Sequence, residues 1–221
     1  MMRFRSIWVA LAFAANAALT GCASVDPIQG QEALTHAIPC CSSLSEVPSV
    51  PFDEVRDQIV YLDPSRPVVD LPSGKTFALL VELPEDRKFS RLVINSYYAS
   101  YSVHPFSGRH TTRIVYPTVS ILNSARKVVR VIPKFEFSFT RETWSEPTRL
   151  TTTITLSPDQ DAEKYVAIYT TAEAIAYKSN YTGQGTTGVM TGGVPVIVPT
   201  FVKRTALGSA VGGIKLTALS E

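Results

Sequence analysis

The chain contains the stretch Phe77-Ala78-Leu79-Leu80-Val81-Glu82-Leu83, in which large apolar residues occupy every second position. Successive side chains of a β-strand point to opposite faces, so this alternation places them on one face of a strand. A helix would instead show apolar residues at a spacing of three and four positions. The stretch therefore predicts a strand whose one face lies in a hydrophobic core.

The same alternation recurs along the chain at Leu92–Ile94, Val119–Ile121, Leu150–Leu156 and Ile214–Leu219. A further strand is predicted where Phe135, Phe137 and Phe139 alternate with polar residues, and Tyr165–Thr170 is a continuous run of β-forming residues. Turn residues such as Pro72-Ser73-Gly74 separate these segments. The pattern predicts an all-β fold, an antiparallel, jelly-roll-like β-sandwich over residues 51–221.

One or two short helices are expected within the sandwich. Ser157–Ala162 could form a single turn, with Ser157 as the N-cap and Pro158 at the first helical position. Thr171–Lys178 could form two turns. The segment Asn180–Pro199 is rich in Gly, Thr, Val and Pro, and we expect it to be a long irregular loop.

The N-terminus has the layout of a bacterial export signal. Two positive charges, Arg3 and Arg5, precede the uncharged run Ile7–Leu19, which is shorter than the ~20 residues of a membrane-spanning helix. The run ends in Leu19-Thr20-Gly21-Cys22, which resembles the lipoprotein signal cut just before a cysteine. The resemblance implies a signal peptide over residues 1–21 and acyl chains on Cys22, the alternative being a short uncut membrane anchor. More than one acyl chain holds a protein stably on a membrane.

Ala23 follows this cysteine in place of the Asp that tends to retain enteric lipoproteins at the inner membrane. We therefore expect a periplasmic protein anchored in the inner leaflet of the outer membrane. Residues 22–50 are predicted to be a lipidated tether, because Ala23–Pro39 is small and polar without a periodic apolar face.

Charge and composition exclude several functions. The chain has 221 residues with 21 basic and 19 acidic side chains, and removal of the signal with its two arginines brings the balance to zero. No basic field is present to collect nucleic acid, and three cysteines are too few for a disulfide-dense scaffold.

The pair Cys40-Cys41 leaves several chemical states open. An oxidising compartment favours either a vicinal disulfide or intermolecular and mixed disulfides, whereas buried thiols could stay free. A metal site would need further ligands, and His36 is the nearby candidate.

No catalytic residue, cofactor site or metal site is predicted. Gly183-Gln184-Gly185-Thr186-Thr187-Gly188 matches a dinucleotide-binding fingerprint in letters, but the residues after it would not form the helix that this chemistry needs. A hydrolase using His104 or His110 with a carboxylate is a further hypothesis, and the other interpretation is a solvated loop.

A cluster of aromatic residues suggests a glycan site, since aromatic faces pack on the C–H faces of sugars. The candidate residues are Tyr97, Tyr98, Tyr101, His104, Arg109 and Trp144. The other interpretation is that alternate tyrosines line the core while the rest cover the sheet edge.

Several segments together resemble one protein family. They are Pro72–Ala78, Pro117–Leu122 and Tyr165–Thr171, the last followed by a short helix and a Gly/Pro-rich stretch, together with the opening Cys40-Cys41-Ser42-Ser43-Leu44. This order resembles the MalM family, periplasmic proteins encoded in maltose operons, and the lipid-anchored start resembles its shorter lipoprotein members. The chain lacks the Ala/Pro-rich extension of the enteric member.

The resemblance implies a non-catalytic periplasmic protein associated with maltose or maltodextrin transport, with no established catalytic residues to carry over. Its expected partners are the membrane, through the lipid, and a carbohydrate or a sugar-transport component. The alternative is a structural envelope lipoprotein that docks to another protein or to the cell wall.

Overall fold

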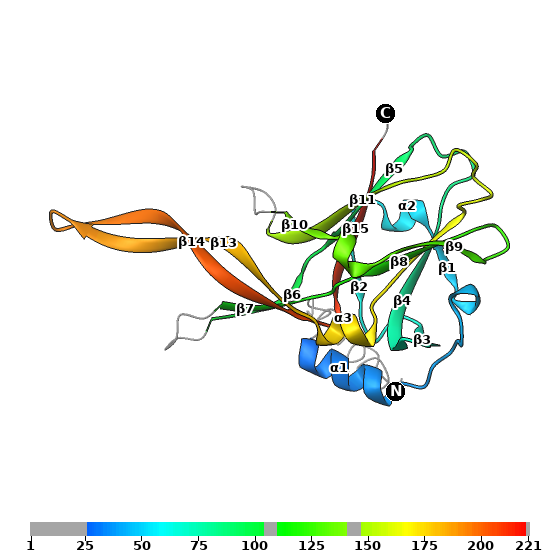
Figure 1. Ribbon diagram of the computed structural model, residues 1–221, viewed down its shortest axis with the longest axis horizontal. Coiled ribbons are helices and arrows are strands. Elements are labelled where there is room, and N and C mark those ends of the chain that lie inside the picture. Colours follow the sequence, from blue (N-terminus) through cyan, green and yellow to red (C-terminus); the bar gives the residue numbers. More distant parts are fainter. Residues whose placement is uncertain (1–25, 104–109, 141–146, 220–221) are drawn as a thin grey trace, which may run out of the picture.

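The computed structural model describes residues 26–103, 110–140 and 147–219, and strands dominate this part of the chain. Two large sheets pack face to face, and a third sheet carries a long hairpin that projects from the body (Figure 1). This architecture confirms the predicted all-β sandwich. Among the described residues, no helix is both long and apolar enough to cross a membrane.

Most neighbouring strands are antiparallel. Two pairs are parallel: β1 (Ser49–Pro51) with β4 (Gly74–Glu82), and β14 (Val194–Gly208) with β7 (His110–Ile114). The six-stranded sheet has the order β1-β4-β12-β8-β9 with β3 also beside β4: β1 (Ser49–Pro51), β3 (Val68–Leu71), β4 (Gly74–Glu82), β8 (Thr118–Leu122), β9 (Val128–Ile132) and β12 (Tyr165–Tyr169). The five-stranded sheet has the order β10-β11-β5-β15-β2: β2 (Ile59–Leu62), β5 (Arg91–Ser96), β10 (Ser138–Thr140), β11 (Arg149–Thr155) and β15 (Gly212–Leu219). The third sheet has the order β13-β14-β7-β6: β6 (Tyr98–Val103), β7 (His110–Ile114), β13 (Lys178–Thr191) and β14 (Val194–Gly208).

The alternating stretch of the sequence is β4, a central strand of the sandwich. Phe77, Leu79 and Val81 are at most 2% exposed and share one core with Leu92 and Ile94 of the opposite sheet. Full burial of each such side chain contributes about 1.5–3 kcal/mol. The predicted strand and its core face are therefore found where the alternation places them.

The second face of β4 is buried as well. Ala78 and Leu80 pack under Cys41, Leu44 and Val47, a segment that includes the short 3₁₀ helix η1 (Leu44–Glu46). These residues are 7% exposed or less. The end of the predicted tether is thus an ordered cover over the outer face of the six-stranded sheet.

A helix also occupies the part of the tether that seemed to lack an apolar face. This helix, α1 (Pro27–His36), begins at Asp26, whose carboxylate accepts a hydrogen bond from the Ile28 N–H at 2.7 Å. Its buried positions are Pro27, Gly30 and Leu34, a helical spacing in which only one residue is large and apolar. Because the helix makes its close contact through a glycine, the sequence lacks the apolar periodicity that would have predicted a buried helix face.

The predicted irregular loop Asn180–Pro199 is wrong, because this segment forms most of the hairpin β13–β14. The two strands stay in register from Lys178–Leu207 to Thr191–Val194. Gly192 and Gly193 form the two-residue turn with φ of 61° and 81°, values that glycine adopts without strain. Threonine and valine pair well across strands, and this outweighs the glycine content.

Two further local predictions are corrected. Phe135 lies in the 3₁₀ helix η2 (Lys134–Glu136) after Pro133, so the strand β10 starts only at Ser138. Ser157–Ala162 does not form a helix. Instead the Ser157 hydroxyl accepts from the Asp159 N–H at 3.1 Å, a local bond that competes with helix formation.

The predicted helix after β12 is present in shorter form as α3 (Ala172–Ala176). The hydroxyl of Thr171 caps it by accepting from the Ala174 N–H at 3.1 Å. A third helix, α2 (Phe52–Val55), follows β1 and buries Phe52 and Val55.

Gly30→Ala tests whether α1 is docked on the domain. A Cβ at this position would lie 2.4 Å from Cγ1 of the buried Val211, so we expect a loss of about 1–2 kcal/mol in the free energy of unfolding. An undocked helix would instead gain about 1 kcal/mol of helix propensity. Urea unfolding measures the difference, with Gln29→Ala on the exposed side as control, and a stabilised Gly30→Ala variant would contradict the docking.

Candidate functional site

Several predicted site residues lie outside the described part of the chain. These are Cys22, His104, Arg109 and Trp144. Tyr101 and His110 contribute backbone to β6 and β7, and their side chains lie outside the description.

Two tyrosines of the predicted glycan cluster lie in the interior. Tyr97 is 7% exposed, and the ring of Tyr98 lies 6.1 Å from the ring of Tyr181, which stacks on Phe139 at 4.5 Å. Burial raises the pKa of Tyr98 strongly, because the charged phenolate would lose its hydration. Tyr97 is thus a core residue, and Tyr98 is partly buried against the core.

Cys40 and Cys41 are joined by a disulfide between neighbouring residues, with a Cα–Cα distance of 3.8 Å. Cys41 is buried, while Cys40 is exposed. The backbone on both sides is fixed to β3: the Cys40 N–H donates to Val68 and the Asp70 N–H donates to Cys41, each at 2.9 Å. In the described ranges, no group of three or more His, Cys, Asp or Glu side chains could hold a metal ion.

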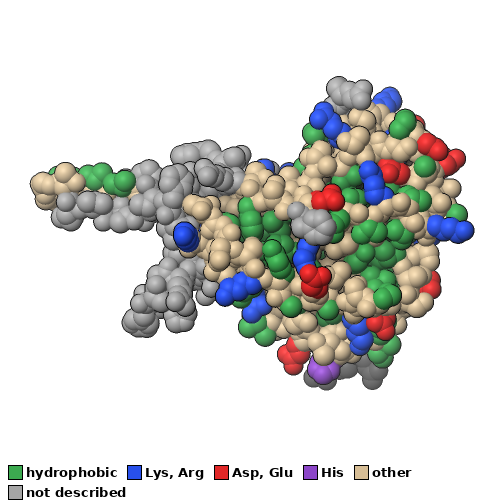
Figure 2. All heavy atoms as spheres, in the orientation of Figure 1, with side chains coloured by type: hydrophobic (Ala, Val, Ile, Leu, Met, Phe, Trp, Pro, Cys, Tyr) green, Lys and Arg blue, Asp and Glu red, His purple; other side chains and the backbone are tan. Residues whose placement is uncertain are grey.

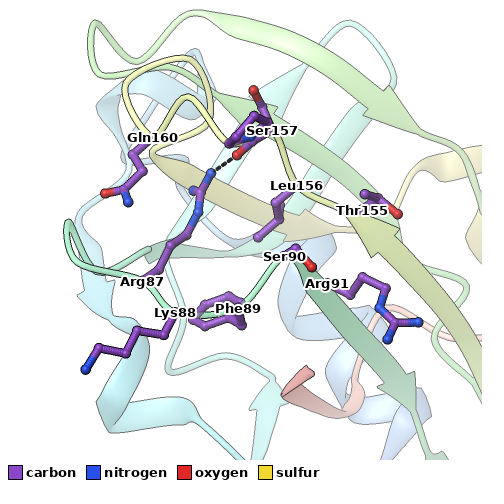
Figure 3. Close-up of a pocket in the computed structure, with 10 residues that line it drawn as sticks. Arg87, Lys88, Phe89, Ser90, Arg91, Thr155, Leu156, Ser157 and Gln160 are labelled. Carbon is purple, nitrogen blue, oxygen red and sulfur yellow. Dashed lines mark hydrogen bonds between the residues drawn. The ribbon is translucent and has the colours of Figure 1, made fainter. Parts of the chain in front are cut away.

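An open cleft lies where the loop after β4 faces the loop after β11. It encloses about 820 Å³, with residues 87–91 on one wall and Thr155–Pro158 and Gln160 on the other. Figure 3 shows Phe89 beneath the cleft, with Arg91 on one side and Gln160 on the other. A cleft of this size falls in the range that small ligands occupy.

Arg87 holds the two walls together. Its guanidinium donates to the backbone carbonyl of Glu163 at 2.7 Å. It also donates to the backbone carbonyl of Ser157 (Figure 3). Burial lowers the pKa of Arg87, and the nearby carboxylates of Glu163 and Asp159 oppose this effect by favouring the charged form. Arg87 is therefore a positioning residue for the cleft.

The carboxylate of Glu163 holds the wall formed by the loop after β11. It is 7% exposed, accepts from the Ser157 N–H at 2.6 Å and pairs with Arg130 at 2.9 Å. A backbone donor and a cationic partner thus hold the carboxylate, and through it the loop from Ser157 to Glu163, in place.

The ligand-facing chemistry of the cleft combines an aromatic ring with polar side chains. Phe89 is half-buried and lies 5.2 Å, ring to ring, from Phe52. Lys88 and Arg91 are exposed, so the cleft carries cationic groups beside an apolar floor. A smaller hollow of about 270 Å³ adjoins it and adds Asp53 and Asp86.

Sequence reasoning did not find the cleft. The run Arg87-Lys88-Phe89-Ser90-Arg91 follows the turn Pro84-Glu85-Asp86, and a polar turn before a strand accounts for such residues without a site. The second wall comes from a loop about seventy positions later, so only the packing of the two sheets brings the walls together.

Taken together, these features define a small all-β sandwich with an ordered N-terminal cover and an open surface cleft. The chain belongs to the family described as maltose operon periplasmic protein precursor (MalM), whose model matches residues 73–184. The match confirms the predicted family and makes the chain a periplasmic protein of the maltose operon type. It runs from the turn before β4 into β13 and includes both walls of the cleft. Neither the curated proteins nor the solved structures that were searched match this chain.

Arg87→Ala tests the positioning role. The substitution leaves two backbone carbonyls without their charged donor, and it removes a positive charge from the neighbourhood of the Glu163 carboxylate. We therefore expect the free energy of unfolding to fall by about 2–3 kcal/mol. Lys88→Ala, on the same loop and exposed, should change it by less than about 0.5 kcal/mol. Urea unfolding of both variants gives the comparison, and equal effects would show that Arg87 does not hold the walls.

Proposed function

We propose that this protein is a non-catalytic, lipid-anchored periplasmic protein that serves carbohydrate uptake by binding a maltodextrin-type glycan in the cleft. The observation that carries the proposal is the cleft itself, which lies inside the region matched by the MalM family model. The family description supplies the maltose context, and the lipid anchor rests on the sequence around Cys22.

The side chains of the cleft suit a neutral sugar. The ring of Phe89 offers an apolar surface for the C–H face of a pyranose, held in place by its contact with Phe52. The guanidinium of Arg91 supplies several donors, and the amide of Gln160 both donates and accepts, as sugar hydroxyls require. The two groups lie on opposite sides of the ring (Figure 3).

Binding without reaction is the simplest use of this arrangement. The cationic side chains at the cleft can hold hydroxyls but are poor proton acceptors, because arginine stays protonated. The carboxylate of Glu163, in the loop that forms the second wall, is occupied by Arg130 and the Ser157 N–H. We therefore assign the cleft to recognition and transfer of a glycan rather than to its hydrolysis.

Calorimetric titration with maltodextrins tests the glycan site. We expect the wild-type protein to release heat on binding at micromolar to millimolar sugar. Arg91→Ala and Gln160→Ala should each weaken binding about tenfold. This corresponds to ~1.4 kcal/mol of binding free energy, the contribution of a hydrogen bond to a charged or bidentate group. Lys178→Ala, an exposed cation on β13, is the control and should bind as the wild type does.

Absence of heat at millimolar maltodextrin would remove the glycan part of the proposal. In that case, crosslinking in cells identifies the alternative, a structural envelope protein, if one protein partner is captured regardless of added sugar.

Metabolic labelling with palmitate tests the anchor. We expect label in the wild-type protein, recovery in the membrane fraction, and loss of both in Cys22→Ser, because this residue would carry the acyl chains. Cys40→Ser removes a different cysteine and should keep the label. Label that persists in Cys22→Ser would place the lipid on another residue, and no label in the wild-type protein would exclude the anchor.

A further inference from the structure

The hairpin β13–β14 is an arm that leaves the body of the protein with no charged residue from Thr182 to Val202. Figure 1 shows it extending well beyond the two packed sheets, and Figure 2 shows it as a narrow projection. On β14, Val194, Val196 and Val198 are 61%, 43% and 39% exposed. An uncharged projection of this length is unusual for a surface that meets only water.

Packing at its base fixes the direction of the arm. The hydroxyl of Tyr116 lies 2.6 Å from that of Ser179, and its ring meets the ring of Tyr177 edge-on at 5.0 Å. Burial raises the pKa of Tyr116 to about 12, in keeping with its place in the interior. Tyr181, which stacks on Phe139, lies on the same face of β13 as Ser179, so this face of the base is packed against the body.

The register of the hairpin shows which backbone groups point away from it. The Gly208 N–H donates to the carbonyl of Tyr177 at 2.8 Å. The backbone N–H and C=O groups of even-numbered residues of β14 therefore face β13, and those of odd-numbered residues face away from it. Consistent with this phase, β7 pairs with β14 from Thr205 to Gly208 on the outward side. On β13, the outward positions are the even-numbered residues, because each pairs with an odd-numbered residue of β14.

The two long edges of the arm differ in a way that matters for pairing. Pro195 and Pro199 both occupy outward positions of β14, where they remove the N–H groups that another strand would need. Prolines on an edge strand are a common defence against edge-to-edge association. The β14 edge of the arm is therefore blocked beyond the part that β7 covers.

The β13 edge has no such protection. This strand is the end strand of its sheet in the described part of the chain, and residues 182–190 contain neither proline nor a charged side chain. The outward N–H and C=O groups of every second residue there form an unblocked ladder.

We propose that β13 pairs edge to edge with β13 of a second copy of this chain, antiparallel, about a two-fold axis at Thr186. This register pairs Thr182 with Met190 of the other copy, so that all of the uncharged residues 182–190 take part. The paired strands would form about ten backbone hydrogen bonds. A two-fold pairing places the same surface on both copies, and here it sets no like charges against each other.

The geometry of the arm makes room for this partner. The eight positions from Thr186 back to Lys178 span about 27 Å in each copy, so the two bodies lie at opposite ends of the joined arms. The turn residues Gly192 and Gly193 then come alongside the base of the other arm, where residues without side chains fit most easily.

Thr186→Pro tests the proposal because it blocks the β13 edge at the two-fold axis without removing a hydrogen bond inside the hairpin. Sedimentation of the wild-type protein should show a dimer at micromolar concentration, and Thr186→Pro should raise the dissociation constant at least tenfold. Ile197→Pro, which adds a third proline to the blocked β14 edge, is the matched control and should leave the dimer intact. A monomeric wild-type protein at 100 μM, or equal effects of the two prolines, would overturn the proposal.

A charge exchange at the same position gives a second test that does not depend on proline. Thr186→Lys and Thr186→Glu should each be monomeric, since like charges would meet across the axis. Mixing the two variants in equal amounts should restore a dimer that contains one of each. A mixture that stays monomeric would contradict the register.

Discussion

Burial of β4 on both faces is the constraint on which the rest of the structure depends. One face of the strand packs into the core between the two large sheets, and the other lies under the segment from Cys41 to Val47. A strand buried in this way cannot shift its register by one residue without exchanging the two faces. Its neighbours β12, β3 and β1 take their positions from it, and the loop that follows it supplies one wall of the cleft.

The cleft in turn depends on two charged groups, the half-buried Arg87 and the buried Glu163. Arg87 reaches from one loop to carbonyls of the other, and Glu163 holds the second loop through Ser157 and Arg130. Each of these groups has its partners, as buried polar groups must if the fold is to tolerate them. Arg91 is exposed and Gln160 is half-buried, and neither of them holds the two loops together, so the residues that shape the cleft differ from those proposed to bind the glycan.

The sequence predicts the sandwich because large apolar residues recur at every second position of its central strands, as at Phe77, Leu79 and Val81. It does not reveal α1, since a helix that buries Pro27, Gly30 and Leu34 has almost no apolar periodicity. The sequence does not predict the hairpin β13–β14, because its glycines and prolines are typical of loops. Only the strand register shows that the prolines lie at positions where a strand tolerates them. The density of tyrosines around Tyr97 is visible in the sequence, but the direction in which Tyr97 and Tyr98 point is set by tertiary packing.

If Cys22 carries the proposed lipid, the docked helix α1 limits how far the body can stand from the membrane. Only four peptide steps separate Cys22 from Asp26, the residue that caps the helix, and a fully extended chain of that length reaches at most about 14 Å. With acyl chains on Cys22, the domain would stay close to the lipid headgroups, because the segment that joins it to the lipid is short. Its orientation, and hence the height at which the arm and the cleft are presented, would then be set by the face that carries the start of this helix.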